Sequence, residues 1–380
     1  MAAPAEEVSV SDGHHIELVD NHMSDAMRDP EPSPGLRDSK GWDGKARVDR
    51  TAVLSNPEAL SDPEYSDDDN VVPGEELPAD EDLLDDEPED TEEIQCTHSR
   101  IQSIPALRLE RFKQVARLCL RQNLIQDIEG LEGLSETLTE LDLYDNLISH
   151  IRGLDALTNL TTLDLSFNKI KHIKHISHLT NLTDLYFVAN KIKVIEGLEG
   201  LANLRQIELG SNRIRKIENL DSLQNLEELW LAKNKITDLT GLAGLPKLRL
   251  LSIQSNRIRS LAPLADVPQL EELYISHNAL DTLEGIEKNT KLQIIDISNN
   301  AIRSIEPLKP LADLTEFWAS YNQIGDFKEV EEVLAKKEKL ETVYFEGNPL
   351  QLRQPALYRN KVRLALPQVQ QIDATFVKVS

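Results

Sequence analysis

An asparagine recurs every 22 residues along much of this 380-residue chain, and this period constrains the fold more than any other feature of the sequence. Nine asparagines share the period: Asn146, Asn168, Asn190, Asn212, Asn234, Asn256, Asn278, Asn300 and Asn322. Asn123 lies 23 residues before this series and Asn348 lies 26 residues after it, so the outermost units are less regular. A fixed period of this length is typical of an array in which each unit packs on its neighbours and no unit folds alone.

Each unit follows the pattern L-x-x-L-x-L-x-x-N-x-I-x-x-I/L-x-x-L-x-x-L, as in "LDLSFNKI" and "IELGSNRI", which is the pattern of a leucine-rich repeat. The L-x-L part alternates with period two, as a short strand does when one of its faces is buried. The apolar residues at every third position that follow favour a tight 3₁₀-like turn. The sequence therefore predicts an α/β repeat solenoid, a leucine-rich-repeat horseshoe with a parallel sheet on its concave side and 3₁₀ or other short turns on its convex side.

The recurring residue, which we call the corner asparagine, has a predicted structural role. Its side-chain amide both donates and accepts, so it can satisfy backbone groups where the chain leaves each strand. The repeats are predicted to span residues 96–350 in 11 to 12 units, and residues 351–380 are predicted to form a C-terminal cap with a helix that ends at Pro367. The apolar residues of that helix are Leu357, Val362, Leu364 and Leu366.

Residues 1–95 are predicted to be a disordered acidic tail. The chain has a formal charge of -25, and residues 1–97 hold 29 Asp and Glu against 6 Lys and Arg. The run from Ser61 to Glu93 contains 17 acids and neither Lys nor Arg. Such a segment cannot bury enough apolar surface to offset the entropy lost on ordering. The acidity therefore belongs to the tail, and the repeats are nearly neutral in sum.

The cysteines and the hydropathy of the sequence indicate in which cellular compartment we expect the protein. The two cysteines, Cys96 and Cys119, have no paired spacing and no Cys/His partner set, so neither a disulfide framework nor a zinc site is predicted and a reducing interior suits the chain. The N-terminal residues lack a basic region followed by an apolar one, and no run of 18 apolar residues occurs. We therefore expect neither secretion nor a membrane partner.

The side chains on the concave face follow from the register of the predicted strands. Of the 22 residues expected there, nine are acidic, five are aromatic and one is basic, whereas Lys and Arg gather just past the corner asparagine, as in "NKIKHIKHI" and "NRIRKI". The position between the two apolar strand residues holds Cys119, Asp142, Asp164, Tyr186, Glu208, Trp230, Ser252, Tyr274, Asp296, Trp318 and Tyr344. The position two residues earlier holds Arg117, Glu140, Thr162, Asp184, Gln206, Glu228, Leu250, Glu272, Ile294, Glu316 and Thr342.

This composition indicates a protein partner. A groove lined with carboxylates repels the phosphates of nucleic acids, so no nucleic acid is expected there. Large rings on the solvent-facing side of a strand suit a protein interface. The expected partner is a folded protein with a basic, partly apolar surface. The alternative is that the rings reflect strand propensity and stacking between neighbouring strands.

No pattern in the sequence predicts catalysis. The chain has no Gly-rich phosphate loop, no nucleophile elbow and no H-E-x-x-H motif. His172, His175 and His178 are spaced three apart, but they neighbour lysines and lack an acidic ligand, so we interpret them as surface residues. We expect no enzyme, no cofactor and no metal.

Several segments of the chain resemble those of a known protein family. The units "LCLRQNLI" and "IELGSNRIR", the segments "EFW" and "LETVYFEGNPLQ" and the closing "YRNKVRLALPQVQQIDATFV" are similar to those of the leucine-rich-repeat regulatory subunits of type 1 serine/threonine protein phosphatase. The resemblance covers residues 96–380. It implies a non-catalytic subunit whose concave face binds the phosphatase catalytic subunit and controls its activity, maturation or localisation, including in mitosis. It also implies a location in the nucleus and cytoplasm and leaves room for a further inhibitor subunit.

The resemblance assigns eight residues of the concave face to this binding site. The family has phenylalanine at two of these positions, where this chain has Tyr186 and Trp230. By itself the chain is expected to be a monomer. The alternative function is a structural leucine-rich-repeat scaffold of a nuclear ribonucleoprotein of the U2 type, which has similar units and a similar cap. The eight residues are Asp164, Tyr186, Glu208, Trp230, Asp296, Glu316, Trp318 and Tyr344.

Overall fold

The structure, a computed structural model, describes residues 15–16, 54–55 and 83–377. The chain divides into two compact units, Met1–Gly74 and Glu75–Ser380. In the first unit β1 (His15–Ile16) pairs antiparallel with β2 (Leu54–Ser55). Most of the predicted acidic tail lies outside the described residues. All of the repeats belong to the second unit.

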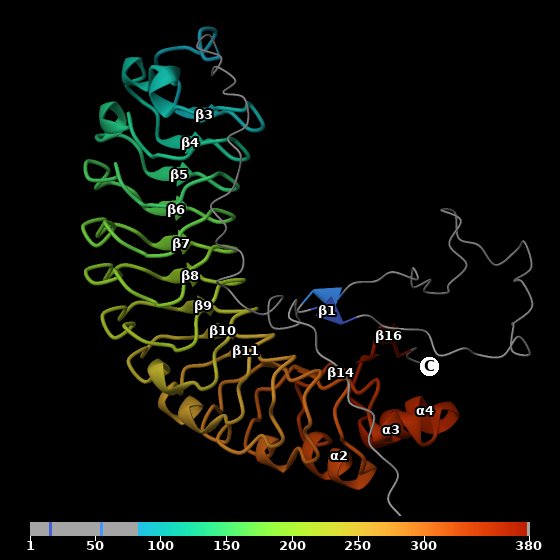
Figure 1. The fold of residues 1–380 in the computed structure, drawn as a ribbon. Coiled ribbons are helices and arrows are strands. Elements are labelled where there is room, and N and C mark those ends of the chain that lie inside the picture. The colour runs from blue at the N-terminus through green and yellow to red at the C-terminus, as the bar shows by residue number, and fades with distance from the viewer. Residues whose placement is uncertain (1–14, 17–53, 56–82, 378–380) are drawn as a thin grey trace, which may run out of the picture. The chain divides into compact units, whose positions relative to one another are not determined.

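The second unit is built on one sheet in which strands adjacent in the chain are also neighbours in space. Strands β3 to β15 run parallel, and each pairing joins equivalent residues, as when Leu163 pairs with Leu185 and Leu229 pairs with Leu251. Figure 1 shows these strands as a curved stack from β3, in cyan, to β14, in orange-red, which confirms the predicted leucine-rich-repeat solenoid. The strands are β3 Glu93–Gln95, β4 Arg117–Cys119, β5 Glu140–Asp142, β6 Thr162–Asp164, β7 Asp184–Tyr186, β8 Gln206–Glu208, β9 Glu228–Trp230, β10 Leu250–Ser252, β11 Glu272–Tyr274, β12 Ile294–Asp296, β13 Glu316–Trp318, β14 Thr342–Tyr344, β15 Gln371–Ile372 and β16 Thr375–Phe376.

The core runs along the length of this stack. The middle residue of each repeat strand is buried while its two neighbours are mostly half-exposed, as Leu185 is between Asp184 and Tyr186. The aliphatic residues that follow each corner asparagine are buried as well. Burying one such side chain contributes about 1.5–3 kcal/mol, largely offset by the entropy of ordering the chain. The strands therefore present one face to the core and leave the other for the concave surface.

The corner asparagines form the predicted internal ladder. The Nδ2 group of Asn190 donates to the carbonyl of Leu165 in the preceding unit at 2.9 Å and to that of Phe187 in its own unit at 3.2 Å. Its Oδ1 atom accepts from the backbone N–H of Ile170 at 2.9 Å. The same arrangement recurs from Asn123 to Asn348, so each amide ties its own turn to the unit before it.

A second amide ladder, which the sequence analysis did not predict, lies on the flank where the chain enters the strands. Four asparagines of successive units each donate Nδ2 to a backbone carbonyl of the preceding unit. These bonds join Asn159 to Glu136 at 3.1 Å, Asn181 to Thr158 at 3.0 Å, Asn203 to Thr180 at 2.9 Å and Asn225 to Ala202 at 2.8 Å.

Short 3₁₀ segments occupy the convex side, as predicted for a 22-residue unit. One unit departs from this, because α2 (Phe327–Leu334) is an α-helix. Its unit is four residues longer than the 22-residue units, which leaves room for two helical turns. The Asp326 carboxylate caps the helix by accepting from the N–H of Lys328 at 2.8 Å. The 3₁₀ segments are Ile104–Leu107, Leu109–Arg111, Glu132–Leu134, Thr240–Leu242, Ala262–Asp266 and Glu306–Leu308.

The repeats begin earlier than the boundary predicted after residue 95. Strand β3 already pairs with β4, and Ile94 is buried in the core. Leu84 is buried too, and the Glu93 carboxylate lies 2.8 Å from the Arg117 guanidinium. The acidic composition of the segment before residue 96 made it look like a disordered tail. Its few apolar residues nevertheless pack against the first repeat, and its acids pair with arginines of the repeats.

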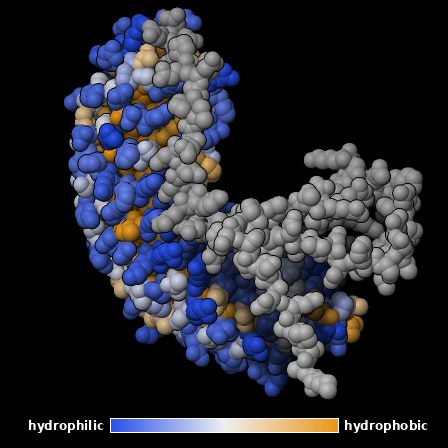
Figure 2. Space-filling view, in the orientation of Figure 1, coloured by the Kyte–Doolittle hydropathy of each residue, from blue (hydrophilic) through white to orange (hydrophobic). Residues whose placement is uncertain are grey.

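The C-terminal cap consists of α3 (Pro349–Leu352), α4 (Pro355–Ala365), β15 and β16. The helix was predicted correctly, but two of the apolar residues assigned to it face solvent, since Leu357 is 53% and Leu364 is 81% exposed. Tyr358, Val362 and Ala365 are the residues of α4 that pack on the core. Figure 2 shows hydrophobic side chains at the surface near these helices.

Candidate protein-binding face

Strand pairing brings the eight predicted site residues into two groups on the concave face. In the first group Asp164, Tyr186, Glu208 and Trp230 are consecutive pairing partners on β6 to β9. In the second group Asp296, Trp318 and Tyr344 are consecutive partners on β12 to β14, and Glu316 precedes Trp318 by two residues. Strands β10 and β11, which carry Ser252 and Tyr274 at the same position, separate the groups. Asp296 is buried, and the other seven side chains are half-exposed.

Three strands carry a ring that is hydrogen-bonded to a carboxylate two residues earlier. Trp318 donates Nε1–H to Oε2 of Glu316 at 3.0 Å. The same pairing joins Trp230 to Glu228 at 3.3 Å and Tyr274 to Glu272 at 2.8 Å. Because the polar atom of each ring is satisfied within the strand, its apolar surface and the remaining carboxylate oxygen are available to a partner. A basic, partly apolar surface complements such a pair.

Trp318 also stacks on its neighbours. Its ring centroid lies 6.0 Å from that of Tyr274, at 56°, and 6.0 Å from that of Tyr344, at 65°. The Tyr344 hydroxyl accepts from Nε2 of Gln371 at 2.7 Å, so the cap fixes the last ring. Tilted ring pairs of this kind stabilise one another. The structure therefore shows the stacking between neighbouring strands that the alternative interpretation of the rings predicted, at Trp318 and Tyr344, and the stack also includes Tyr274 of β11.

The aspartates of the face also have a local structural role. Oδ1 of Asp164 accepts from the N–H of Ser166 at 2.8 Å, and Oδ1 of Asp296 accepts from Ser298 at 2.9 Å. Asp142 does the same with Tyr144 at 3.0 Å. Each bond holds the turn that follows its own strand. An aspartate at this position is therefore useful to the fold whether or not it also contacts a partner.

Arg121 places a positive charge on the concave face near β4 to β6. The register of the strands did not predict this residue there. Its Nε atom lies 3.2 Å from Oδ2 of Asp142, and its Nη2 atom lies 4.0 Å from Oδ2 of Asp164. The guanidinium also lies 4.3 Å from the ring centroid of Tyr144. Arg121 follows the strand in the turn, so only the folded arrangement shows that it reaches back over the concave acids.

Burial and mutual repulsion shape the electrostatics of the first group. Burial raises the pKa of Glu208, the charges of Asp164 and Glu228 raise it further, and a hydrogen bond from Gln206 at 2.9 Å opposes the rise. Burial also raises the pKa of Tyr186 to about 12, with Asp184 and Glu208 adding to it. A cation that approached Glu208 would relieve the cost of its negative charge.

The described residues, 83–377 in the repeat unit, lack a group of side chains suited to metal binding. They contain no cluster of three or more His, Cys, Asp or Glu able to hold a metal ion. The three clustered histidines do not converge, since Nδ1 of His172 lies 2.8 Å from Glu196 and Nε2 of His178 lies 3.1 Å from the Leu154 carbonyl oxygen. No helix in the described part is both long and apolar enough to span a membrane.

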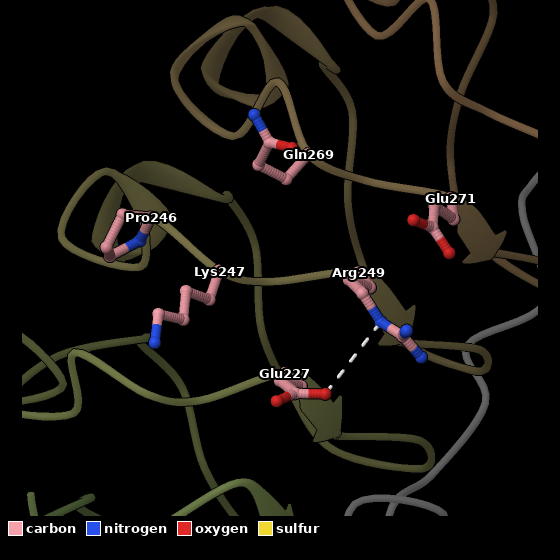
Figure 3. A pocket seen from close by; sticks show the side chains of 6 residues that line it. All are labelled: Glu227, Pro246, Lys247, Arg249, Gln269 and Glu271. Atoms are coloured by element: carbon pink, nitrogen blue, oxygen red, sulfur yellow. Dashed lines mark ion pairs between the residues drawn. The ribbon is translucent and has the colours of Figure 1, made fainter.

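One polar pocket of about 360 Å³ lies on the flank at the start of β9 to β11 (Figure 3). Nε of Arg249 lies 3.9 Å from Oε2 of Glu227 across it. Nζ of Lys247, at the same pocket, donates to Oδ1 of Asn225 at 2.6 Å. Its lining residues are Glu227, Pro246, Lys247, Arg249, Gln269 and Glu271.

This fold and its concave face are those of a leucine-rich-repeat protein. The family "Leucine Rich repeats (2 copies)" matches residues 136–178, 224–266 and 268–310, and "Leucine rich repeat" matches residues 158–214. An internalin of Listeria monocytogenes superposes with a TM-score of 0.60 at 26% identity, covering 75% of this chain and 87% of the internalin. A leucine-rich-repeat protein of Leptospira interrogans gives a TM-score of 0.55 at 23% identity over 69% of this chain and 73% of its own.

Among proteins of known sequence, the chain is similar to "Protein phosphatase 1 regulatory subunit SDS22" of Schizosaccharomyces pombe, with 56% identity over 85 residues, which is 22% of this chain and 25% of the relative. The protein of the same name in Saccharomyces cerevisiae is 46% identical over 87 residues, 22% of this chain and 26% of the relative. "Protein phosphatase 1 regulatory subunit 7" of Homo sapiens is 69% identical over 39 residues, 10% of each chain. The matched stretches span about a quarter of the two yeast relatives. They confirm the resemblance that the sequence motifs indicated.

Proposed function

We propose that this chain is a non-catalytic regulatory subunit of type 1 serine/threonine protein phosphatase and that its concave face binds the phosphatase catalytic subunit. The names of the relatives support the class of partner. The observation that carries the proposal is the repeated pairing of a ring with a carboxylate on the concave face, seen at Trp230, Tyr274 and Trp318. Three such pairs on one sheet present apolar surface and negative charge together.

The proposal includes how the face would act. The eight residues predicted from the sequence would contact the catalytic subunit, with Trp230 and Trp318 as anchors in the two groups. The acids would steer a basic surface toward the groove, which raises the association rate more than the final affinity. Control of phosphatase activity, maturation or localisation in mitosis, a further inhibitor subunit, a monomeric free state and a location in the nucleus and cytoplasm remain predictions.

A pull-down of the full chain from a nuclear extract, read by mass spectrometry, tests the proposal. The double variant Glu316→Lys/Trp318→Ala should lose the phosphatase catalytic subunit while its circular dichroism stays that of the wild type. A matched control is Glu338→Lys/Leu364→Ala, which reverses one charge and removes one exposed apolar side chain away from the face. Undiminished phosphatase with the first variant would refute the proposal. Recovery of ribonucleoprotein proteins in place of phosphatase would decide for the scaffold alternative.

A further inference from the structure

The residue just before each corner asparagine has a left-handed backbone conformation. At this position, which we call the rim position, φ lies between 54° and 73° from Gln122 to Gly347. Large side chains are disfavoured in this conformation, and Gly, Asn and Asp tolerate it best. Two aromatic residues nevertheless occupy rim positions, Phe167 with φ of 56° and Tyr321 with φ of 55°. The other rim positions hold Gln122, Asp145, Ala189, Ser211, Lys233, Ser255, His277, Asn299 and Gly347.

The core does not explain these two rings. Phe167 is 44% exposed and Tyr321 is 54% exposed, which places both among the few large apolar side chains that face solvent in the described repeats. Of the nine other rim positions, seven hold a polar residue and two hold Ala189 and Gly347, in the same left-handed conformation. The fold therefore holds two large rings in a left-handed backbone conformation without burying them, which is the kind of local conflict expected at functional sites.

Phe167 is held in place by a chain of contacts that leads to the concave acids. Its ring centroid lies 4.7 Å from that of Tyr144. The Tyr144 ring lies under the Arg121 guanidinium at 4.3 Å, and Arg121 reaches Asp142 at 3.2 Å and Asp164 at 4.0 Å. The orientation of the exposed ring is thus coupled to an acid of the candidate binding face.

The Tyr321 ring is positioned by a different contact. A Cβ atom added at Gly347 would lie 2.4 Å from Cδ1 of Tyr321, so the ring rests against the one rim position that has no side chain. The backbone N–H of Tyr321 donates to the Glu346 carbonyl at 2.7 Å. The glycine therefore leaves room for the ring beside the next turn.

The two rim rings stand beside the two groups of site residues. Phe167 lies three residues after Asp164 on β6, and Tyr321 lies three residues after Trp318 on β13. Both rims belong to the edge of the sheet where the parallel strands end. The seven strand steps between them correspond to roughly 34 Å along the curved sheet. An interface that buries about 800 Å² per partner has a similar width.

We infer that Phe167 and Tyr321 are contact residues of the same interface, each receiving an apolar side chain of the phosphatase catalytic subunit at the rim of the concave face. The inference rests on the proposed function. It extends the interface from the strands to their carboxyl-terminal turns, and it explains why these two units tolerate an aromatic residue in a left-handed conformation. Both rings are pre-oriented, so little side-chain entropy is lost when the partner binds.

The test is the affinity of the purified catalytic subunit for full-length Phe167→Asn, Tyr321→Asn and the double variant. Each single change should weaken binding about tenfold and the double change about a hundredfold, because sites this far apart contribute independently. The melting temperature should change little, because asparagine adopts the left-handed conformation more readily and this offsets the ring pair that Phe167 loses with Tyr144. Ser255→Asn, at the rim position between the two rings, is the matched control and should bind like the wild type.

The outcomes separate this inference from the proposed function. If the wild type does not bind the catalytic subunit, the proposed function fails. If the wild type binds, Glu316→Lys/Trp318→Ala abolishes binding and the rim variants bind like the wild type, the concave face is the site and the rim inference is refuted. Weaker binding accompanied by a lower melting temperature would also refute it, because the rings would then be structural.

Discussion

The substitution Trp318→Leu separates the two roles that the structure gives to this ring. The ring stacks on Tyr274 and Tyr344, each at 6.0 Å, and its Nε1–H donates to Glu316 at 3.0 Å. Leucine keeps some apolar volume but removes both ring pairs and the hydrogen bond. A purely structural ring would affect folding alone, whereas an anchor would also affect binding.

The expected magnitudes follow from these contacts. Each ring pair contributes about 0.5–1.5 kcal/mol, and a half-exposed hydrogen bond to a carboxylate adds about 1 kcal/mol. The free energy of unfolding should therefore fall by about 2–4 kcal/mol. If Trp318 is an anchor of the interface, the loss in binding free energy should reach at least about 2 kcal/mol, which is a roughly 30-fold weaker affinity.

Trp230→Leu is the comparison that isolates binding from stability. In the described part of the chain no ring pair includes Trp230, although its Nε1–H bonds to Glu228 at 3.3 Å as Trp318 bonds to Glu316. Urea denaturation should show a smaller loss of stability than for Trp318→Leu, while a titration with the catalytic subunit should show a similar loss of affinity. Normal affinity in both variants would refute the anchor role and leave the rings as stacking residues.

Three further predictions test parts of the account. Asn190→Leu should lower the free energy of unfolding by about 2–4 kcal/mol, because the buried N–H of Ile170 loses its acceptor. Urea denaturation measures this, and an equal loss in the exposed control Asn181→Ala would contradict it. Lys337 is buried, donates Nζ–H to the Leu308 and Leu311 carbonyls, and has its pKa lowered by burial from 10.5 to about 8. The unfolded chain therefore binds more protons than the folded chain between these two values. Stability should rise with pH across that window, and denaturation of Lys337→Met should show no such rise. The association rate with the catalytic subunit, measured by stopped flow, should fall as salt is raised from low to physiological strength, and a salt-independent rate would contradict steering by the acidic face.

The period of the sequence predicted the parts of the fold that depend on register. Every unit places its strand, core and concave residues at the same distances from its corner asparagine. Once the position of an asparagine such as Asn190 is known, these residues can be assigned in all units. The pairing of Glu316 with Trp318 on one strand follows from the period of two along a strand. The concave face and its acids could therefore be assigned from the sequence.

The missed features depend on contacts that no local pattern encodes. Arg121 lies in a turn, and only the fold brings it to Asp142 and Asp164. Strand β3 was obscured because its acidic surroundings resemble a disordered segment, although Ile94 is buried. Leu364 was counted among the apolar residues of the cap helix, yet the packing of α4 leaves it 81% exposed.

The affinity of purified type 1 phosphatase catalytic subunit for the full chain, measured by calorimetric titration, tests the central claim most directly. The account predicts saturable binding to the wild type and to the control Glu338→Lys/Leu364→Ala. It predicts at least about 100-fold weaker binding to Glu316→Lys/Trp318→Ala, because that variant removes both an anchor and its paired acid. Equal affinity for all three proteins, or no binding to the wild type, would contradict it.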